Sequence, residues 1–427
     1  MPTGAALVVR ALEDEGIRLA FGIPGTHNIE LYDVLITSDR VRPILVTDEQ
    51  SASFMADAAW RASGVMACVN IVPGAGLTHA MSGIAEAFMD AVPMLVLGCG
   101  IRRDSGMAYQ LHDVDQAAIA GPVTKGTFRP ERGEEIYATI RRACRLAREG
   151  RPGPVFVEIP ADFYLFKHDA PPRFSESQAS ARPVDDLIER AAKVLASAKK
   201  PLIYAGLGAA GARESLIRIA EMLEAPVATT FQGKGVFPES HPLSLWPGYG
   251  ASAPPFAQSV AKGCDATLAI GCRFGEVATG SFGAPPPGRL VHIDIDPEAV
   301  GRNYPAEVGI VADAATVLPK LLAKLSPRTP DAALREAIRD GRARAAREIQ
   351  TPSAEGVSPG KLIRALQERF GPDTIFTADS GNGTFIAVEA LRLDSPGKLL
   401  APVDYSCMGY SVPAAIGAKL AMPDAPV

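Results

Sequence analysis

The feature that most constrains the fold of this chain is an alternation between short apolar runs and longer stretches with helical spacing of apolar residues. In the first part of the chain, the apolar runs occupy residues 19–22, 44–46, 67–72, 94–97 and 155–159. Runs of this length that are separated by amphipathic helices are typical of a parallel sheet covered by helices on both faces. The sequence therefore predicts an α/β fold of doubly wound parallel sheets.

Two stretches rich in proline, serine and charge interrupt this pattern, at residues 166–184 and 351–359. They lack periodicity, so they are predicted to be linkers. We therefore predict three α/β domains, at residues 1–165, 185–325 and 359–427. A chain of 427 residues is also too long for a single hydrophobic core.

The composition argues against several classes of function. A net charge of −5 and the lack of a dense basic run give no support to nucleic-acid binding. The six cysteines are scattered without a C-x-x-C pair, so we expect reduced, mostly buried thiols rather than a zinc site. No apolar run approaches the roughly 18 residues that span a bilayer, and residues 13–15 are acidic where a signal peptide would be apolar. We expect a cytoplasmic enzyme that makes no contact with membranes.

One glycine-rich motif, G-x-G-x-x-G at residues 206–211, lies between a predicted strand and a predicted helix. A nicotinamide site would also need an acidic residue at the end of the next strand, to bind a ribose. The next strand runs through residues 227–230 without such a residue. The sequence therefore favours a tight strand-to-helix turn over a dinucleotide site.

Four further residues are candidates whose meaning the local sequence leaves open. Glu49 lies between a predicted strand and an alanine-rich helix, where the simplest role is that of an acid favoured by the helix dipole. Gly74 and Gly76 lie in another strand-to-helix turn, which would let a ligand or a backbone approach closely. Met408 precedes a helix and, taken alone, is most simply a core methionine.

The order of several motifs along the chain resembles that of acetolactate-synthase-like enzymes, which depend on thiamine diphosphate. The motifs that resemble the family's pyrimidine-binding domain are residues 22–25, 48–50, 56–57, 83–93 and 151–154. Those that resemble its central domain are residues 235–242, 271–274 and 292–297. Residues 379–381 and 408–418 resemble the start of its diphosphate-binding domain. The resemblance runs in unbroken order over essentially the whole chain and implies three doubly wound domains.

The resemblance implies roles for residues at the pyrimidine end of the cofactor. Glu49 matches the acid that hydrogen-bonds the pyrimidine N1′ and favours the tautomer that removes the proton from thiazolium C2. A carboxyl group in an apolar pocket can keep its own proton near neutral pH, because burial penalises the charged form. The remaining residues assigned here to cofactor binding are Pro24, Gly25, Gly74, Gly76 and His79.

The resemblance also implies roles near the thiazolium and diphosphate ends. Met408 matches the bulky apolar side chain that wedges between the two cofactor rings, and a flexible thioether suits an irregular gap. The carbonyl of Ser406 is expected to accept a hydrogen bond from the 4′-amino group. The glycine-rich turn expected beside the diphosphate comprises Ser380, Gly381, Asn382 and Gly383.

Two histidines depart from the family pattern. When Lys125 is placed on the family's lysine, His112 falls where a glutamine usually faces the reaction centre. An imidazole there can donate a hydrogen bond or transfer a proton to a bound 2-oxo acid, although a surface histidine is the alternative. His79 stands where the family has asparagine. Both changes suggest a substrate or a second step unlike those of housekeeping acetolactate synthesis.

The cofactors beyond thiamine diphosphate are less constrained by the residues. Arg151 and Arg273 match positions that hold FAD in related central domains, but residues 275–277 lack the family's second arginine, so FAD is left open. The family's Gly-Asp-Gly motif, which supplies the Mg²⁺ ligands, is expected shortly after Val427. No residue of this chain is assigned as a metal ligand. The chain is therefore expected to be a fragment, or to be completed by a second polypeptide, and to bind the cofactor poorly as it stands.

The leading hypothesis from the resemblance is carboligation. A 2-oxo acid loses CO₂ on the cofactor, and the resulting enamine attacks a second carbonyl compound. The alternatives are a simple 2-oxo acid decarboxylase or C–C lyase, for which His112 would suit as a proton donor, and a non-catalytic scaffold or partner subunit that lacks the metal site. In this family one subunit holds the pyrimidine end and its neighbour holds the diphosphate end, so a homodimer or homotetramer is expected.

Overall fold

The computed structural model describes residues 1–169, 184–351 and 355–427. Most of the first predicted linker and the centre of the second fall outside these residues. By its internal contacts the chain divides into two compact units. Unit 1 comprises Met1–Ser177, Ile375–Ser380 and Leu400–Val427, and unit 2 comprises Gln178–Thr374 and Gly381–Leu399. The residues of the third predicted domain are thus shared between the two units, and the three domain boundaries stay a prediction.

Unit 1 contains a six-stranded parallel sheet with the strand order β2-β1-β3-β4-β6-β5. Its strands are β1 (Leu19–Gly22), β2 (Arg42–Leu45), β3 (Cys68–Ile71), β4 (Met94–Gly100), β5 (Thr127–Phe128) and β6 (Pro154–Pro160). Its helices are α1 (Gly4–Asp14), α2 (Ile29–Leu35), α3 (Glu49–Ser63), α4 (Ala75–Met89), α5 (Gln116–Ala120), α6 (Ile136–Arg148), α7 (Ala161–Leu165) and α15 (Ser411–Ala421).

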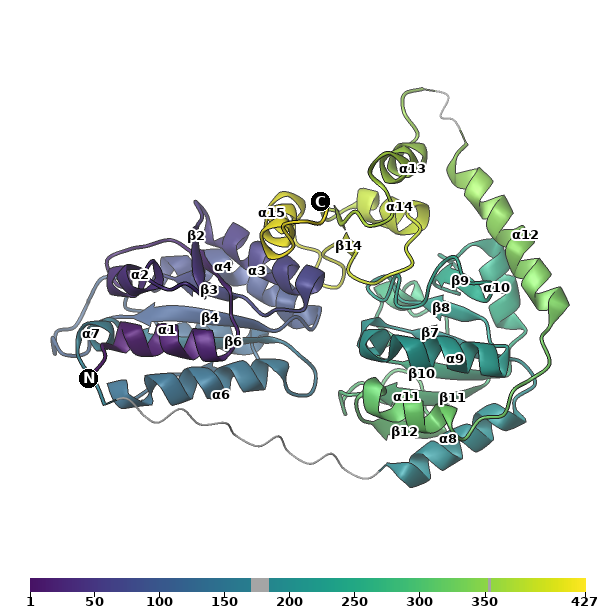
Figure 1. Cartoon of the computed structure of the whole chain (residues 1–427), viewed down its shortest axis with the longest axis horizontal. Coiled ribbons are helices and arrows are strands. Elements are labelled where there is room, and N and C mark those ends of the chain that lie inside the picture. Colours follow the sequence, from purple (N-terminus) through teal and green to yellow (C-terminus); the bar gives the residue numbers. More distant parts are fainter. Residues whose placement is uncertain (170–183, 352–354) are drawn as a thin grey trace. The chain divides into compact units, whose positions relative to one another are not determined.

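Helices cover both faces of this sheet. Figure 1 shows α1 and α6 on one face and α3 and α4 on the other, and each face has its own apolar core. Strands β3, β4 and β6 are buried along their whole length, as the continuous apolar runs predict. Helix α15 packs directly against α3, where a Cβ on Gly417 would lie only 2.3 Å from the carbonyl oxygen of Met55.

Unit 2 is built on a second six-stranded parallel sheet, with the order β12-β11-β10-β7-β8-β9. Its strands are β7 (Pro201–Ala205), β8 (Val227–Thr229), β9 (Ser244–Pro247), β10 (Ala266–Ile270), β11 (Arg289–Asp294) and β12 (Val308–Val311). Its helices are α8 (Asp185–Ser197), α9 (Arg213–Leu223), α10 (Pro255–Lys262), α11 (Ala314–Leu322), α12 (Ala332–Ile349), α13 (Pro359–Phe370) and α14 (Asn382–Ala390). Helices α8, α9 and α11 contribute to the core on one face, and α10 and α12 to the core on the other.

The fold class predicted from the sequence is confirmed, and the differences lie mainly at the sheet edges. The short strands β5, β9 and β12 were not predicted, and each is at or near an edge, where one neighbouring strand is enough to hold it. The strand expected at residues 374–378 is β13 (Phe376–Thr377), which pairs with β14 (Leu399–Leu400). The glycine motif at residues 206–211 forms a short 3₁₀ turn, in which a Cβ on Gly206 would lie 2.1 Å from the carbonyl oxygen of Gly271. Close backbone packing therefore accounts for that glycine.

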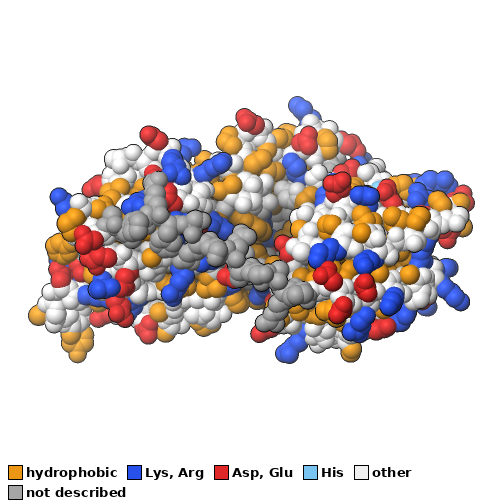
Figure 2. Space-filling model, turned by 60° about the horizontal axis from the view of Figure 1, so that its bottom comes forward, with side chains coloured by type: hydrophobic (Ala, Val, Ile, Leu, Met, Phe, Trp, Pro, Cys, Tyr) orange, Lys and Arg blue, Asp and Glu red, His pale blue; other side chains and the backbone are white. Residues whose placement is uncertain are grey.

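The distribution of surface charge and the length of the helices indicate which kinds of partner the protein can contact. Figure 2 shows one face of the molecule, on which Lys and Arg side chains are interspersed with Asp and Glu side chains. Among the described residues, no helix is both long enough and apolar enough to cross a membrane.

Candidate functional site

The first candidate side chain, Glu49, is the first residue of α3 and lies just past the end of β2. The N-cap of this helix is Asp48, whose carboxylate accepts a hydrogen bond from the backbone N–H of Ser51 at 2.9 Å. Glu49 is therefore not needed to cap the helix, and its side chain points inward with only 9% of its surface exposed. This arrangement separates Glu49 from the purely structural role that its sequence position suggested.

The turn between β3 and α4 lies directly against Glu49. A Cβ on Gly76 would lie 2.9 Å from Val72 Cγ2 and 3.3 Å from Glu49 Oε1, so only glycine leaves this space open. A Cβ on Gly25 would lie 2.5 Å from Val72 Cγ1, which brings the turn after β1 to the same place. Because β1, β2 and β3 run parallel, their carboxyl ends meet at one edge of the sheet, where α/β folds bind ligands. We call Gly25, Glu49, Gly74 and Gly76 the pyrimidine cluster, after the cofactor ring that they are predicted to face.

His79 also joins the pyrimidine cluster, from the first turns of α4. Its Nδ1 lies 3.3 Å from Glu49 Oε2, and 65% of its side chain is exposed. The expected partners Glu49, Gly76 and His79 are thus brought together.

His112 lies at the other side of the β3–α4 turn, against Gly74. A Cβ on Gly74 would lie 3.4 Å from the carbonyl oxygen of His112, and the backbone N–H of Gly74 donates to Gln116 Oε1 at 3.2 Å. His112 has a φ of +66°, a left-handed conformation that residues other than glycine seldom adopt. Such backbone strain is concentrated at functional sites. The role of His112 in the site stays a prediction.

A second histidine, His27, was missed in the sequence analysis. Its ring packs edge-on against that of His112, with centroids 5.6 Å apart. Burial lowers the pKa of His27, and the nearby His112 lowers it further, while Glu30 raises it. The available sequence signal was its place two residues after Gly25, at the carboxyl end of β1.

Gly76 gives the first test of this cluster. We expect Gly76→Ala to weaken thiamine diphosphate binding by about tenfold or more, because the new methyl group would crowd Glu49 and Val72. Alanine is otherwise the better helix former, so loss of helix propensity cannot explain a weaker affinity. The affinity is measured by calorimetric titration in the presence of Mg²⁺.

The matched control is Gly121→Ala, because no part of the chain that the structure describes lies within 4 Å of its Cβ position and its φ of −49° suits any residue. Equal affinities of the Gly76→Ala variant and the Gly121→Ala variant would remove Gly76 from the cofactor site.

The segment expected at the other end of the cofactor is held by Asp379. Its carboxylate accepts hydrogen bonds from the backbone N–H groups of Ser380, Gly409 and Ser411, at 2.9 to 3.0 Å. Burial alone would raise the pKa of Asp379, but these donors lower it. The hydroxyl groups of Ser380 and Ser406 lie 2.7 Å apart. The structure therefore brings Ser380 and Ser406 together within unit 1.

The other residues expected near the diphosphate begin helix α14, in unit 2. Gly381 has a φ of +125°, and no atom of the described residues lies within 4 Å of the Cβ positions of Gly381 and Gly383. The first turn of a helix presents backbone N–H groups that suit a phosphate. Asn382 is the first residue of this helix.

Met408, the expected wedge, is 79% exposed. It belongs to unit 1, as does Glu49. Tyr410, two residues after Met408, hydrogen-bonds Asp57, which is eight residues beyond Glu49 on α3 and so about 12 Å along its axis. Within one chain the wedge is therefore displaced from the pyrimidine cluster.

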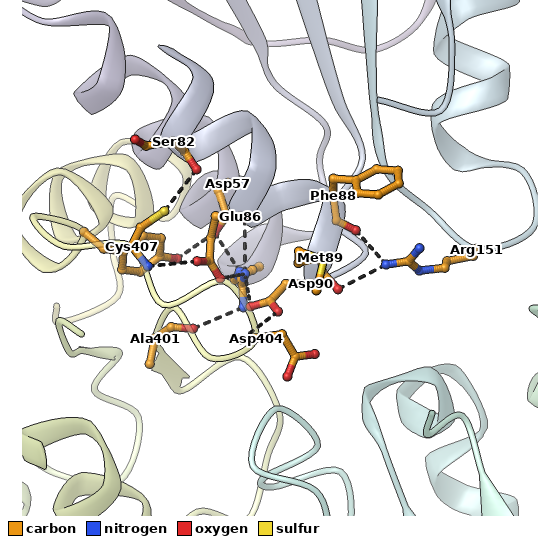
Figure 3. Close-up of polar contacts among 12 residues, drawn as sticks. Asp57, Ser82, Glu86, Phe88, Met89, Asp90, Arg151, Ala401, Asp404 and Cys407 are labelled. Carbon is orange, nitrogen blue, oxygen red and sulfur yellow. Dashed lines mark hydrogen bonds and ion pairs between the residues drawn. The ribbon is translucent and has the colours of Figure 1, made fainter. Parts of the chain in front are cut away.

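Two cations that were expected to bind substrate or cofactor also have structural contacts. Lys125 Nζ donates hydrogen bonds to the carbonyl oxygens of Leu146 and Glu149, at the carboxyl end of α6. Arg151 Nη2 donates to the carbonyl oxygens of Phe88 and Met89 at the end of α4, at 2.7 and 3.1 Å (Figure 3). Cations are favourable at helix carboxyl ends, so both residues are explained without a ligand.

Arg273, the second residue expected to bind FAD, lies in unit 2 just after β10. It is half-buried and exerts a favourable electrostatic effect on the carboxylate of Asp294, at the end of β11. The roles of Lys125, Arg151 and Arg273 in catalysis or cofactor binding stay predictions.

Comparisons with known proteins agree with this geometry. Models of the thiamine pyrophosphate enzyme family match the chain at residues 2–119 (N-terminal TPP binding domain), 188–321 (central domain) and 379–427 (C-terminal TPP binding domain). The predicted dependence on thiamine diphosphate is thereby confirmed.

Several relatives are similar over nearly the whole chain. A probable acetolactate synthase large subunit of Methanocaldococcus jannaschii is 34% identical over 99% of this chain and 74% of its own length. The large subunit of acetolactate synthase isozyme 3 of Escherichia coli is also 34% identical, over 99% of this chain and 76% of its own. An acetolactate synthase of Mycobacterium bovis is 33% identical, over 99% and 70%. The chain therefore belongs to the family of thiamine-pyrophosphate-dependent enzymes that includes the acetolactate synthases.

Proposed function

We propose that this chain decarboxylates a 2-oxo acid and joins the remaining fragment to a second carbonyl compound. The observation that carries the proposal is the buried Glu49 carboxyl group, which lies beside a glycine turn that leaves space against it. The relatives are named acetolactate synthases, which favours carboligation over simple decarboxylation or C–C lysis, and enzyme activity over a scaffold role.

Product analysis tests this proposal. The protein is incubated with thiamine diphosphate, Mg²⁺ and pyruvate, alone or with another 2-oxo acid, and the products are identified by NMR. The proposal predicts an acetohydroxy acid or an acyloin. A free aldehyde as the sole product would show that the fragment is protonated rather than ligated.

In this mechanism the residues of the chain control protons and water. When bound, thiamine diphosphate would supply an acidic carbon that, once deprotonated, adds to the 2-oxo group, and a ring that takes up the electron pair released when CO₂ leaves. Glu49 exchanges a proton with the pyrimidine N1′, and its burial keeps water from competing for that proton. Gly74 and Gly76 leave room for the ring system.

We assign His112 to proton transfer at the bound substrate, with His27 beside it. We expect His112→Ala to reduce kcat by about 100-fold, which is typical for the loss of a general acid or base. The less drastic His112→Gln keeps a hydrogen-bond donor, so it should preserve KM for the 2-oxo acid while kcat still falls. Steady-state kinetics measure both effects. An unchanged kcat in His112→Ala would show that this residue is a surface histidine with no role in proton transfer.

We further propose that the functional unit is at least a homodimer. Met408 is exposed and displaced from Glu49 within the chain, which supports a site where one subunit supplies Glu49 and its neighbour supplies Met408. The inactive variants Glu49→Gln and Met408→Asp are mixed in equal amounts and refolded together. Half of the resulting dimers contain one chain of each variant, and one of the two sites in such a dimer is intact. The mixture should therefore regain about a quarter of wild-type activity. Activity that stays at the sum of the two parents would contradict a shared site.

Mg²⁺ is proposed as the ion that anchors the diphosphate. Among the residues that the structure describes, Asp48, Glu49 and His79 place possible ligand atoms within 4.8 Å of one another. We do not assign Mg²⁺ to this group, because Glu49 is assigned to the pyrimidine.

FAD is proposed as an optional ligand of unit 2. A cavity of about 640 Å³ there is lined by aromatic side chains, including Phe231, Trp246 and Phe385, and is large enough for a planar ring system. Flavin fluorescence released on denaturation tests its occupancy. A cytoplasmic location stays a prediction.

A further inference from the structure

A buried cluster of four charged side chains joins α3 to α4 in unit 1. Arg61 is bound by Asp57 at 2.6 Å, by Asp90 at 2.8 Å and, more loosely, by Glu86 at 3.8 Å. The side chain of Arg61 is 8% exposed, and those of the three acids are fully buried. We call these four residues the Arg61 cluster (Figure 3).

The Arg61 cluster binds the chain segment 401–410 at several points. Arg61 Nη1 donates to the carbonyl oxygen of Ala401 at 3.5 Å, and the N–H of Asp404 donates to Asp90 at 3.4 Å. The N–H of Cys407 donates to Glu86 Oε2 at 3.3 Å, and the Tyr410 hydroxyl donates to Asp57 Oδ1 at 2.6 Å.

Cys407 has a second contact with α4, since its thiol donates to the carbonyl oxygen of Ser82 at 3.0 Å. Each acid of the Arg61 cluster thus accepts a hydrogen bond from a different residue of the segment. Asp90 accepts from Asp404, Glu86 from Cys407 and Asp57 from Tyr410.

This segment contains Ser406 and Met408, which the proposed function assigns to the cofactor. Met408 is 79% exposed, so packing of its own side chain within the unit does little to fix its position. Its placement depends on the backbone that Cys407 and Tyr410 hold on either side. Contacts of those two residues with Glu86 and Asp57 therefore set where Met408 projects.

The charge balance of the cluster requires a proton. Three buried carboxylates beside one guanidinium would leave an excess negative charge away from water, which is costly. Asp57 and Asp90 have short ion pairs with Arg61, whereas Glu86 Oε1 lies 3.8 Å from it and the Glu86 carboxyl group has a side-chain hydrogen bond with Asp90. Glu86 is thus the acid least compensated by the arginine and the natural site of the proton.

The pKa values of the acids agree with this geometry. Burial, together with the neighbouring Asp90, raises the pKa of Glu86 to about 9, although Arg61 opposes the shift. Burial also raises the pKa values of Asp57 and of the Cys407 thiol.

Other charged or titratable groups, outside the Arg61 cluster, also lie near Glu86. Asp404, Cys407 and Tyr410 face it from the segment, and the Cys407 thiol bonds Ser82 on the same helix as Glu86. Arg151 binds the carbonyls of Phe88 and Met89, at the end of that helix next to Asp90.

We propose that Glu86 is a positioning residue, which in its neutral form lets the Arg61 cluster hold segment 401–410 and thereby sets the place of Ser406 and Met408. This inference depends on the proposed function only for the roles of Ser406 and Met408 at the cofactor. Ionisation of Glu86 favours release of the segment, because an exposed carboxylate is solvated and a buried one is not.

Linkage gives the direction of the pH effect. Between the pKa of an exposed glutamate, about 4.5, and about 9, Glu86 holds its proton when the segment is bound and loses it when the segment opens. Opening therefore becomes more favourable as pH rises through this window, by up to about tenfold per pH unit, and levels off above it. Glu86→Gln, which cannot ionise, should lack this dependence.

Hydrogen exchange followed by mass spectrometry on the peptide that covers residues 401–410 measures the opening. At each pH the exchange rate of the wild type is divided by that of Glu86→Gln, which cancels the intrinsic pH dependence of amide exchange. The ratio should rise about tenfold per unit between pH 6 and 8. Glu336→Gln, which changes a 65%-exposed acid, should exchange like the wild type.

Two further results would decide the proposal. Glu86→Gln should keep the segment protected at pH 7, whereas Glu86→Ala should lose that protection, and KM for thiamine diphosphate should follow the same order. A ratio that is constant with pH, or a Gln variant that exchanges as fast as the Ala variant, would overturn it. Because exchange needs no catalysis, the proposal can fail while the proposed function stands, and the reverse.

Discussion

Replacing Glu49 with glutamine is expected to abolish exchange of the C2 proton of bound thiamine diphosphate. The side chain keeps its size and stays in its buried place, but an amide cannot exchange a proton with the pyrimidine N1′. Turnover should fall by at least about 100-fold, and by up to about 10,000-fold, the range found when a general acid or base is removed. Deuterium exchange at C2, followed by quenched-flow NMR, measures the step directly.

The neighbouring acid provides the control for this experiment. Asp48→Asn changes an adjacent carboxylate but preserves a good N-cap for α3, so C2 exchange should stay close to that of the wild type. If Glu49→Gln exchanged C2 at the normal rate, Glu49 would be only a helix N-terminal acid.

Removing Arg61 should cause the largest loss of stability among the substitutions considered. Arg61→Met leaves the carboxyl groups of Asp57, Glu86 and Asp90 buried without their common cation. The removal of one partner from a buried ion pair costs about 3–5 kcal/mol in the free energy of unfolding. Urea titration measures it through the fluorescence of Trp60 on α3, in a Trp246→Phe background that leaves one of the two tryptophans.

An exposed ion pair serves as the control for Arg61. Arg102 binds Asp104 at 2.6 Å, with exposed fractions of 49% and 36% for the two side chains. Solvent weakens such pairs, so Arg102→Met should leave the urea midpoint unchanged. If the Arg61→Met variant behaved in the same way, the Arg61 cluster would not support unit 1.

The strands and the candidate residues Glu49 and Gly76 could be identified because their signals are local. The apolar runs at residues 94–97 and 155–159 are long enough to identify the central strands β4 and β6, which are buried over their whole length. Glu49 and Gly76 follow directly from strand ends, where parallel sheets gather their functional side chains. The sequence could not show that Glu49 Oε1 lies 3.3 Å from the Cβ position of Gly76.

The residues that were missed depend on contacts between distant parts of the chain. His27 was missed because it is far in sequence from His112, which was predicted. Their ring contact exists only because the segments that follow β1 and β4 meet. Glu86 reads as an ordinary helix residue until segment 401–410 covers it. Lys125 and Arg151 show the opposite case, because family position suggested a ligand while the folded chain offers them helix carbonyls.

The most direct test of the central claim is a calorimetric titration with thiamine diphosphate in the presence of Mg²⁺. It is carried out on this chain and on a version that continues past Val427 with the matching residues of a relative, each with and without Glu49→Gln. The account predicts saturable binding to the extended protein, and a markedly lower affinity when Glu49 is replaced. An extended protein that fails to bind thiamine diphosphate at all would contradict the account.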